Sequence, residues 1–289
     1  MAAASQHEVG LLLTGAMLTD VGCVRPHNED AVAFVVPSSD GTTADQDSLM
    51  LVADGMGGHA AGEVASALAA EVIRRVFYDL KGAPSDVLAS AFMAANKAIL
   101  DYAGAHPECQ GMGTTCTAVA VQGRGAWLAH VGDSRAYLLR GAKLTQLSED
   151  QTLVAKLVRE GVLTEDEAAR SEHNNIILQA LGTTPEIVPA IWAEPLRLVP
   201  GDILILSSDG LHGLVSDTEI TEIAGRMPPL DACKALIARA RDAGGHDNIS
   251  VGVFALREAE RAARASDHAT RRIEVPQHVL AEPGREFGA

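Results

Sequence analysis

The sequence is poor in aromatic residues and in cysteine. Phe, Trp and Tyr make up 3% of its 289 residues, so a hydrophobic core must be built from Ala, Val, Leu and Ile. The few cysteines are scattered and form no Cys-x-x-Cys pair, which argues against a zinc site and predicts reduced thiols. They are Cys23, Cys109, Cys116 and Cys233.

Positive charge is also scarce. The 23 Lys and Arg against 38 Asp and Glu give a formal net charge of -15. Nucleic-acid binders neutralise phosphates with Lys and Arg, so this balance argues against a nucleic-acid partner. The excess acid either aids solubility or gathers around bound cations. Composition leaves both readings open, and the positions of the acidic residues must decide.

Long apolar runs are missing as well. The run 11–18 is interrupted by Thr14 and Gly15 and follows Glu8 rather than basic residues. It is too short to span a membrane and lacks the charged start of a signal peptide. We therefore expect a soluble, cytoplasmic protein, and a monomer by default.

The chain is nevertheless 47% hydrophobic, and its apolar residues follow strand and helix patterns. The expected strands are a segment from about Ala16, then 31–36, 49–53, 111–121, 125–140 with a turn at 132–134, 187–198, 202–207 and 249–256. Helical spacing predicts helices over 64–80, 88–102, 153–159 and 230–241, and capping boxes predict others after Thr164 and Ser216. This order of elements indicates a layered sandwich rather than alternating βαβ units.

Four segments are expected. Residues 1–14 form a leader or edge strand, and 15–256 form one domain. Within that domain, 148–187 break the strand pattern and are interpreted as an inserted, mobile flap. The tail 257–289 begins as a fraying helix and becomes disordered.

Three aspartates stand at the ends of apolar segments. Asp54 and Asp209 each follow such a segment and precede glycine, whereas Asp247 precedes a segment and is followed by Asn248. An Asp-Gly pair alone is most often a turn. Three aspartates at strand ends, two of them beside glycines whose carbonyls can approach a ligand, predict a site for Mg²⁺ or Mn²⁺.

Six motifs occur in an order that resembles the bacterial PPM family, the type 2C metal-dependent protein phosphatases. They are RPHNED at 25–30, DGMGGH at 54–59, GTT at 113–115, VGDSR at 131–135, SSDGL at 207–211 and DNIS at 247–250. The resemblance covers roughly residues 15–256. It implies an α+β fold, a four-layer αββα sandwich in which helices flank two central antiparallel sheets.

The same resemblance implies a binuclear metal site and the roles of individual residues. The implied ligands of the two core ions are Asp54, the Gly55 carbonyl, Asp209 and Asp247. Glu29 would hold metal-bound water, with Asp30 orienting the site from behind it. Asp133 with Asp209 would hold a third, weaker ion, and Arg25 would bind the substrate phosphate. His59 is a candidate general acid, although it could instead orient a ligand or a water.

These residue types suit phosphate ester hydrolysis. Two nearby cations lower the pKa of a bridging water, so that hydroxide is available near neutral pH for in-line attack on phosphorus. The planar fork of Arg25 can grip two phosphate oxygens. The glycine-rich run 55–62 lacks the lysine of a nucleotide-binding P-loop.

The leading hypothesis is therefore a signalling enzyme, a protein serine/threonine phosphatase that requires Mn²⁺ or Mg²⁺. Its implied partners are phosphorylated proteins and a serine/threonine kinase as counterpart. Two alternatives remain open. One is a metal-binding module that has lost catalysis, and the other is a hydrolase of small phosphoesters or nucleotides.

Overall fold

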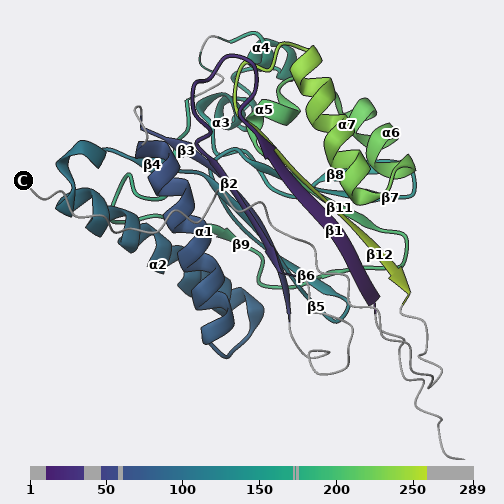
Figure 1. Cartoon of the computed structure of the whole chain (residues 1–289), viewed down its shortest axis with the longest axis horizontal. Coiled ribbons are helices and arrows are strands. Elements are labelled where there is room, and N and C mark those ends of the chain that lie inside the picture. The colour runs from purple at the N-terminus through teal and green to yellow at the C-terminus, as the bar shows by residue number, and fades with distance from the viewer. Residues whose placement is uncertain (1–10, 36–46, 58–60, 172, 174–175, 259–289) are drawn as a thin grey trace, which may run out of the picture. The chain divides into compact units, whose positions relative to one another are not determined.

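The computed structural model describes residues 11–35, 47–57, 61–171, 173 and 176–258. All of them belong to one unit of the chain, Met1–Ala259. In this part of the chain, two antiparallel sheets lie face to face, and helices cover the outer face of each (Figure 1). The predicted four-layer α+β sandwich is therefore confirmed.

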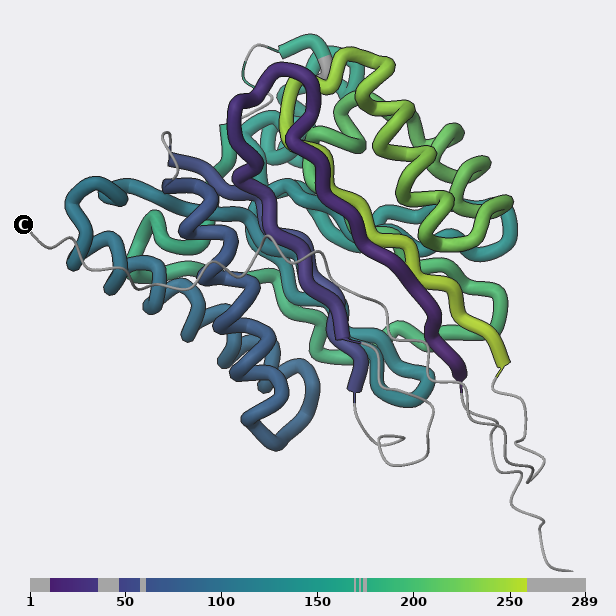
Figure 2. The backbone as a smooth tube through the Cα atoms, viewed as in Figure 1, coloured from purple at the N-terminus to yellow at the C-terminus, as the bar shows by residue number. Residues whose placement is uncertain are grey.

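One sheet has five strands in the order β1-β12-β11-β7-β8. Its strands are β1 (Leu11–Asp20), β7 (Arg135–Arg140), β8 (Lys143–Gln146), β11 (Ile203–Ser207) and β12 (Ile249–Glu258). Figure 2 shows the first and last described strands, β1 and β12, side by side. They pair antiparallel, with Leu11 opposite Glu258 and Asp20 opposite Ile249.

The other sheet has seven strands, of which five follow the order β10-β6-β5-β3-β2, while β4 pairs with β3 and β9 with β6. Its strands are β2 (Asp30–Val35), β3 (Ser48–Met56), β4 (Gly113–Thr114), β5 (Cys116–Gln122), β6 (Gly125–Val131), β9 (Ala190–Ile191) and β10 (Leu196–Arg197). The long helices are α1 (Ala61–Asp79), α2 (Pro84–Ala105), α6 (Asp217–Arg226) and α7 (Pro229–Asp242). The short ones are η1 (Pro107–Cys109), α3 (Leu153–Arg159), α4 (Glu165–Ala169) and α5 (Asp209–His212).

Strand alternation divides the core into three apolar layers. Because successive side chains of a strand point to opposite faces, Met50 and Val52 of β3 pack between the sheets, whereas Leu51 packs beneath α1 and α2. In the same way, Leu206 faces the space between the sheets and Ile205 faces α6 and α7. Most buried side chains are Ala, Val, Leu and Ile, as the composition predicts. Apolar side chains pack against both faces of each sheet.

Several element boundaries differ from the expected ones. The expected strand 187–198 is reduced to β9 and β10, because Pro189 and Pro195 lack the N–H that a ladder needs. The first strand begins at Leu11 rather than near Ala16, since β12 is long enough to pair with it throughout. Arg257 still belongs to β12 instead of starting a helix. The rest of the expected tail, 259–289, lies outside the described residues.

The other helix predictions are confirmed. Both capping boxes form, with Thr164 bonded to Glu167 at α4 and Ser216 bonded to Glu219 at α6. The short helices α3 and α4 lie in the segment 148–187. Sequence patterns missed β8 and α5, which are only four residues long each.

Candidate metal centre

Strand register brings the acidic residues to one edge of the sandwich. Asp30, at the start of β2, lies opposite Asp54 near the end of β3. The two sheets meet there, since the Ser208 hydroxyl donates to Asp30 Oδ2 at 2.8 Å. We call the five residues gathered at this edge the acidic edge. They are Asp30, Asp54, Asp133, Asp209 and Asp247.

The main chain of Asp54 is held from both sides by threonines. The register of β3 with β5 ends at Val52 opposite Thr117, and pairing resumes with β4 at Gly55 opposite Thr114. The Asp54 N–H donates to Thr115 Oγ1 at 3.0 Å. The Asp54 carbonyl accepts from the Thr114 hydroxyl and the Thr115 N–H, each at 2.9 Å. Asp54 therefore occupies a fixed position at the strand end.

Gly55 and Gly62 permit a close approach beside Asp54. A Cβ at Gly55 would lie 2.1 Å from the Gly62 carbonyl oxygen, and one at Gly62 would lie 2.9 Å from Cδ of Glu29. The Gly55 N–H also donates to the Glu29 carbonyl at 3.1 Å. Glycine is thus required at both positions for Glu29 to pack against the start of α1.

Asn248 ties the loop before β2 to the start of β12. Its side chain accepts from the Glu29 N–H at 2.8 Å and donates to the carbonyls of Val21 and His27, at 3.0 and 2.9 Å. Sequence reasoning quoted Asn248 in a motif but gave it no role. The three residues it contacts are more than 200 positions away, so no local pattern could have revealed them.

Burial and mutual repulsion disfavour the charged forms of these carboxylates. Burial, and then the nearby Asp209, raises the pKa of Asp30 and the pKa of Asp133 to about 7 each. Burial raises the pKa of Asp54 well above its usual value, and the other four acidic-edge carboxylates add to the effect. The pKa of Asp209 is raised by burial and by Asp247. A bound cation would reverse this penalty by favouring the charged forms.

The carboxylate oxygens at this edge that accept no hydrogen bond from the described residues suit a hard cation. Within the described part of the chain, Asp30 Oδ1 and Asp209 Oδ1 are buried and accept no hydrogen bond. Among the described residues, no group of three or more His, Cys, Asp or Glu side chains is arranged to hold one metal ion by itself. Mg²⁺ and similar ions usually keep several waters and take one or two carboxylates, so an open set of carboxylates still fits them.

Asp247 is the exposed member of the acidic edge. It forms an ion pair with Arg25, Nη2 to Oδ2 at 2.7 Å, and the two side chains are 49% and 35% exposed. Its Oδ1 accepts from the Asn248 N–H at 2.8 Å. The structure therefore brings Arg25, Glu29, Asp54, Gly55, Asp133, Asp209 and Asp247 to one edge. His59 lies outside the described residues, and its role stays a prediction.

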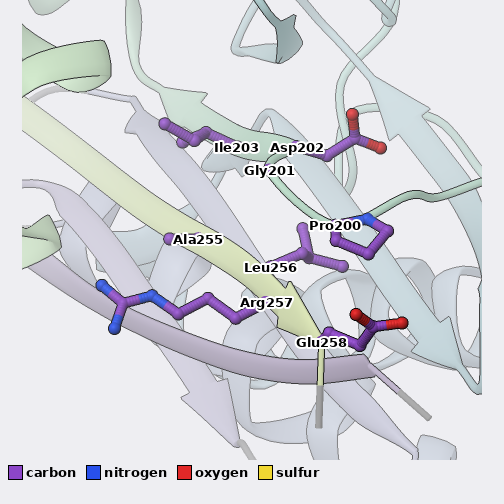
Figure 3. A pocket seen from close by; sticks show the side chains of 8 residues that line it. All are labelled: Pro200, Gly201, Asp202, Ile203, Ala255, Leu256, Arg257 and Glu258. Carbon is purple, nitrogen blue, oxygen red and sulfur yellow. The ribbon is translucent and has the colours of Figure 1, made fainter. Parts of the chain in front are cut away.

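A hollow lies at the opposite end of the strands (Figure 3). It is lined by Pro200, Gly201, Asp202, Ile203, Ala255, Leu256, Arg257 and Glu258. None of the site residues predicted from the sequence lines it. Of the helices in the described ranges, none has the length and apolar character needed to cross a membrane.

A family model described as protein phosphatase 2C matches residues 26–242. The chain belongs to this family. The match includes the end of the β1–β2 loop, the strands from β2 to β11 and the segment 148–187, so the family resemblance predicted from six motifs is confirmed.

Curated relatives of this protein phosphatase 2C chain include bacterial enzymes. The chain is 40% identical over 248 residues to the serine/threonine protein phosphatase PstP of Mycobacterium tuberculosis, covering 85% of this chain and 45% of that protein. It thus spans about half the length of that relative. It is 35% identical to the protein phosphatase PhpP of Streptococcus pneumoniae, covering 85% of this chain and 98% of that one.

A solved structure of PstP gives the same fold. The catalytic domain of PstP in complex with two manganese ions superposes with a TM-score of 0.75 and 37% identity. The match covers 86% of this chain and 99% of that one. Family membership and this fold support metal dependence, whereas the choice between Mn²⁺ and Mg²⁺ is not distinguished.

Proposed function

We propose that this chain is a metal-dependent protein serine/threonine phosphatase. One observation carries the proposal. Five carboxylates converge at the end of two sheets, and two of their buried oxygens accept no hydrogen bond from the described residues. Divalent cations would stabilise such a cluster at neutral pH, because they favour the charged carboxylates that burial disfavours. The curated relatives are serine/threonine phosphatases, which supports this chemistry for the edge.

We assign the ions to the residues as follows. Two divalent cations would be held by Asp54, the Gly55 carbonyl, Asp209 and Asp247, and Glu29 would hold water bound to them. Asp133 with Asp209 would hold a third, weaker ion, and Asp30 would orient the site from behind, through Ser208. When bound, the cations would supply hydroxide near neutral pH and neutralise charge on the phosphoryl group.

Arg25 is suited to bind the substrate phosphate. Its guanidinium lies at the exposed margin of the acidic edge, where a phosphorylated side chain can approach. One terminal nitrogen contacts Asp247, and a guanidinium has five N–H donors in a planar fork. The remaining donors can therefore orient a phosphate and stabilise charge on its oxygens during transfer.

The proposed substrates are phosphoserine and phosphothreonine on proteins, with a serine/threonine kinase as the counterpart. The segment 148–187 would screen substrates beside the site. Cytoplasmic localisation and a monomeric state remain predictions of the sequence.

The test is phosphate release from a phosphothreonine peptide with Mn²⁺, with chelator, and with an Asp209→Asn variant. We expect release that requires Mn²⁺ and vanishes in the variant. Wild-type protein that binds Mn²⁺ by calorimetry but releases no phosphate would instead support the binding-module alternative. Faster hydrolysis of nucleotides than of the peptide would support a small-phosphoester hydrolase.

A further inference from the structure

A chain of buried side chains runs behind Asp54 to the start of the segment 148–187. We call it the hydroxyl chain, and its members are Thr115, Thr117, His130 and Ser134. All four are 0% exposed. None of them is among the proposed metal ligands, so the phosphatase chemistry described above gives them no role.

The contacts of the hydroxyl chain are short and continuous. The Asp54 N–H donates to Thr115 Oγ1 at 3.0 Å, and Thr115 Oγ1 lies 2.7 Å from Ser134 Oγ. The Thr117 hydroxyl donates to the Ser134 carbonyl at 2.6 Å. Thr117 Oγ1 also lies 2.8 Å from Nδ1 of His130. All of these contacts are direct, so each residue of the hydroxyl chain restrains the position of the next.

His130 is the last member of the hydroxyl chain, at the end away from Asp54. Its Nε2 lies 3.0 Å from the carbonyl oxygen of Glu149, which can only accept, so Nε2 carries the hydrogen of a neutral ring. Burial lowers the pKa of His130 to about 4 and keeps the ring neutral. Nδ1 is then an acceptor, and the single hydrogen of the Thr117 hydroxyl is shared between Nδ1 and the Ser134 carbonyl. This contact holds the Thr117 side chain in one orientation.

Packing against Gly132 fixes Thr115, the member of the hydroxyl chain that contacts Asp54. A Cβ at Gly132, whose φ is 104°, would lie 2.6 Å from Cβ and Cγ2 of Thr115. Thr115 thus fills the space that a side chain at 132 would occupy, which restricts its rotamer. Its hydroxyl lies between Ser134 Oγ and the Asp54 N–H. A shift of Ser134 is therefore transmitted to Asp54.

We propose that His130 is a positioning residue that fixes the main chain of Asp54, through Thr117, Ser134 and Thr115, and thereby raises the affinity of the acidic edge for divalent cations. The inference rests on the proposed function only in taking Asp54 as a metal ligand. Hydrogen-bonded groups behind a ligand commonly change metal affinity or activity about 10–100-fold when removed.

Two substitutions separate the contacts of the two ring nitrogens of His130. An asparagine amide can reach the place of Nδ1, so His130→Asn keeps the contact with Thr117 and loses Glu149. A glutamine amide can reach the place of Nε2, so His130→Gln keeps Glu149 and loses Thr117. We expect the calorimetric Kd for Mn²⁺ to rise about tenfold in His130→Gln and to change less than about twofold in His130→Asn.

Thr117→Val and Thr14→Val form a matched pair that preserves side-chain shape. Thr14 lies in β1 and donates to the Ala255 carbonyl, at 3.4 Å, far from the acidic edge. We expect Thr117→Val to raise the Kd for Mn²⁺ about tenfold and Thr14→Val to leave it unchanged. Equal Kd values for both His130 variants, or a wild-type Kd in Thr117→Val, would overturn the inference.

Hydrogen exchange of the Asp54 N–H tests the connection between His130 and Asp54 in the absence of metal. In chelator, the Asp54 N–H should exchange about tenfold faster in His130→Gln and Thr117→Val than in the wild type, because its acceptor Thr115 is less constrained. Unchanged exchange would overturn the inference. Since no substrate is involved, this result is independent of whether wild-type protein releases phosphate, which decides the proposed function separately.

Discussion

The two halves of the acidic edge differ in how their charge is compensated. The inner half, Asp30, Asp54, Asp133 and Asp209, is largely covered, and its pKa values are raised by burial and by neighbouring carboxylates. The outer half is Asp247, which is paired with Arg25 and remains exposed. Arg25 compensates the charge of the outer half, whereas bound cations would compensate the charge of the inner half. We infer that metal binding is driven mainly by relief of the inner carboxylates.

The largest expected effect is loss of activity in Asp54→Asn. A bound cation contributes several kcal/mol of charge stabilisation to the transition state, and 1.36 kcal/mol corresponds to a tenfold change in rate. Phosphopeptide hydrolysis in saturating Mn²⁺ should therefore fall at least about a thousandfold. Retention of more than a tenth of the wild-type rate would contradict the role given to Asp54.

Metal-free stability should separate the two halves. In chelator at pH 8, Asp54→Asn should raise the melting temperature by about 3 °C or more, because it removes one of several repelling buried charges. Asp247→Asn should lower it slightly, since Arg25 loses its partner. Thermal unfolding followed by circular dichroism measures both. A change in the same direction in both variants would mean that the inner and outer carboxylates are equivalent.

The inner half also predicts an unusual dependence of stability on pH. The folded pKa values of Asp30 and Asp133 are about 7, above the ordinary value of 3.8. Folding therefore favours the protonated forms, and the stability they contribute is fully present below pH 3.8 and is lost as pH rises through 7. The metal-free protein should melt at a lower temperature at pH 8 than at pH 6.

Saturating Mn²⁺ should remove or reverse this trend, because a cation favours the charged carboxylates. Binding at pH 7 should accordingly release about one proton, which calorimetry in two buffers of different ionisation enthalpy detects. Proton release near zero at pH 7 would show that these carboxyls are already ionised in the metal-free protein.

The carboxylates and the groups that hold them were unequally visible in the sequence. Asp54, Asp209 and Asp247 were predictable because each stands beside an apolar segment, and strand ends meet at a sheet edge. The partners that hold Asp54 were not, since Thr115 lies 61 positions away and no periodic pattern relates the two.

The fold shows the same limit. Hydrophobic alternation located most strands of the sandwich, but the break between β4 and β5 depends on Thr115 turning its hydroxyl to Asp54. The short strands β9 and β10 depend on two prolines. The Arg25–Asp247 pair joins residues 222 positions apart, so their separate motifs gave no sign of direct contact. Tertiary geometry, rather than local propensity, decides all of these features.

Among substitutions in the proposed site, the smallest expected effect on metal binding is that of Arg25→Gln. An exposed ion pair is worth about 0–1 kcal/mol, so losing the contact with Asp247 should change the Kd for Mn²⁺ by less than about fivefold in either direction. The KM for a phosphopeptide should rise about tenfold or more, since charge-assisted hydrogen bonds to phosphate contribute about 1.5–3 kcal/mol.

Arg25→Lys keeps the charge but not the planar fork, so its KM should lie between those of Arg25→Gln and the wild type. Calorimetry for Mn²⁺ and steady-state kinetics on the same preparations test both parts. If Arg25→Gln weakened Mn²⁺ binding as strongly as Asp54→Asn, Arg25 would belong to the metal-binding machinery rather than to phosphate recognition. The distinction between the two halves would then be lost.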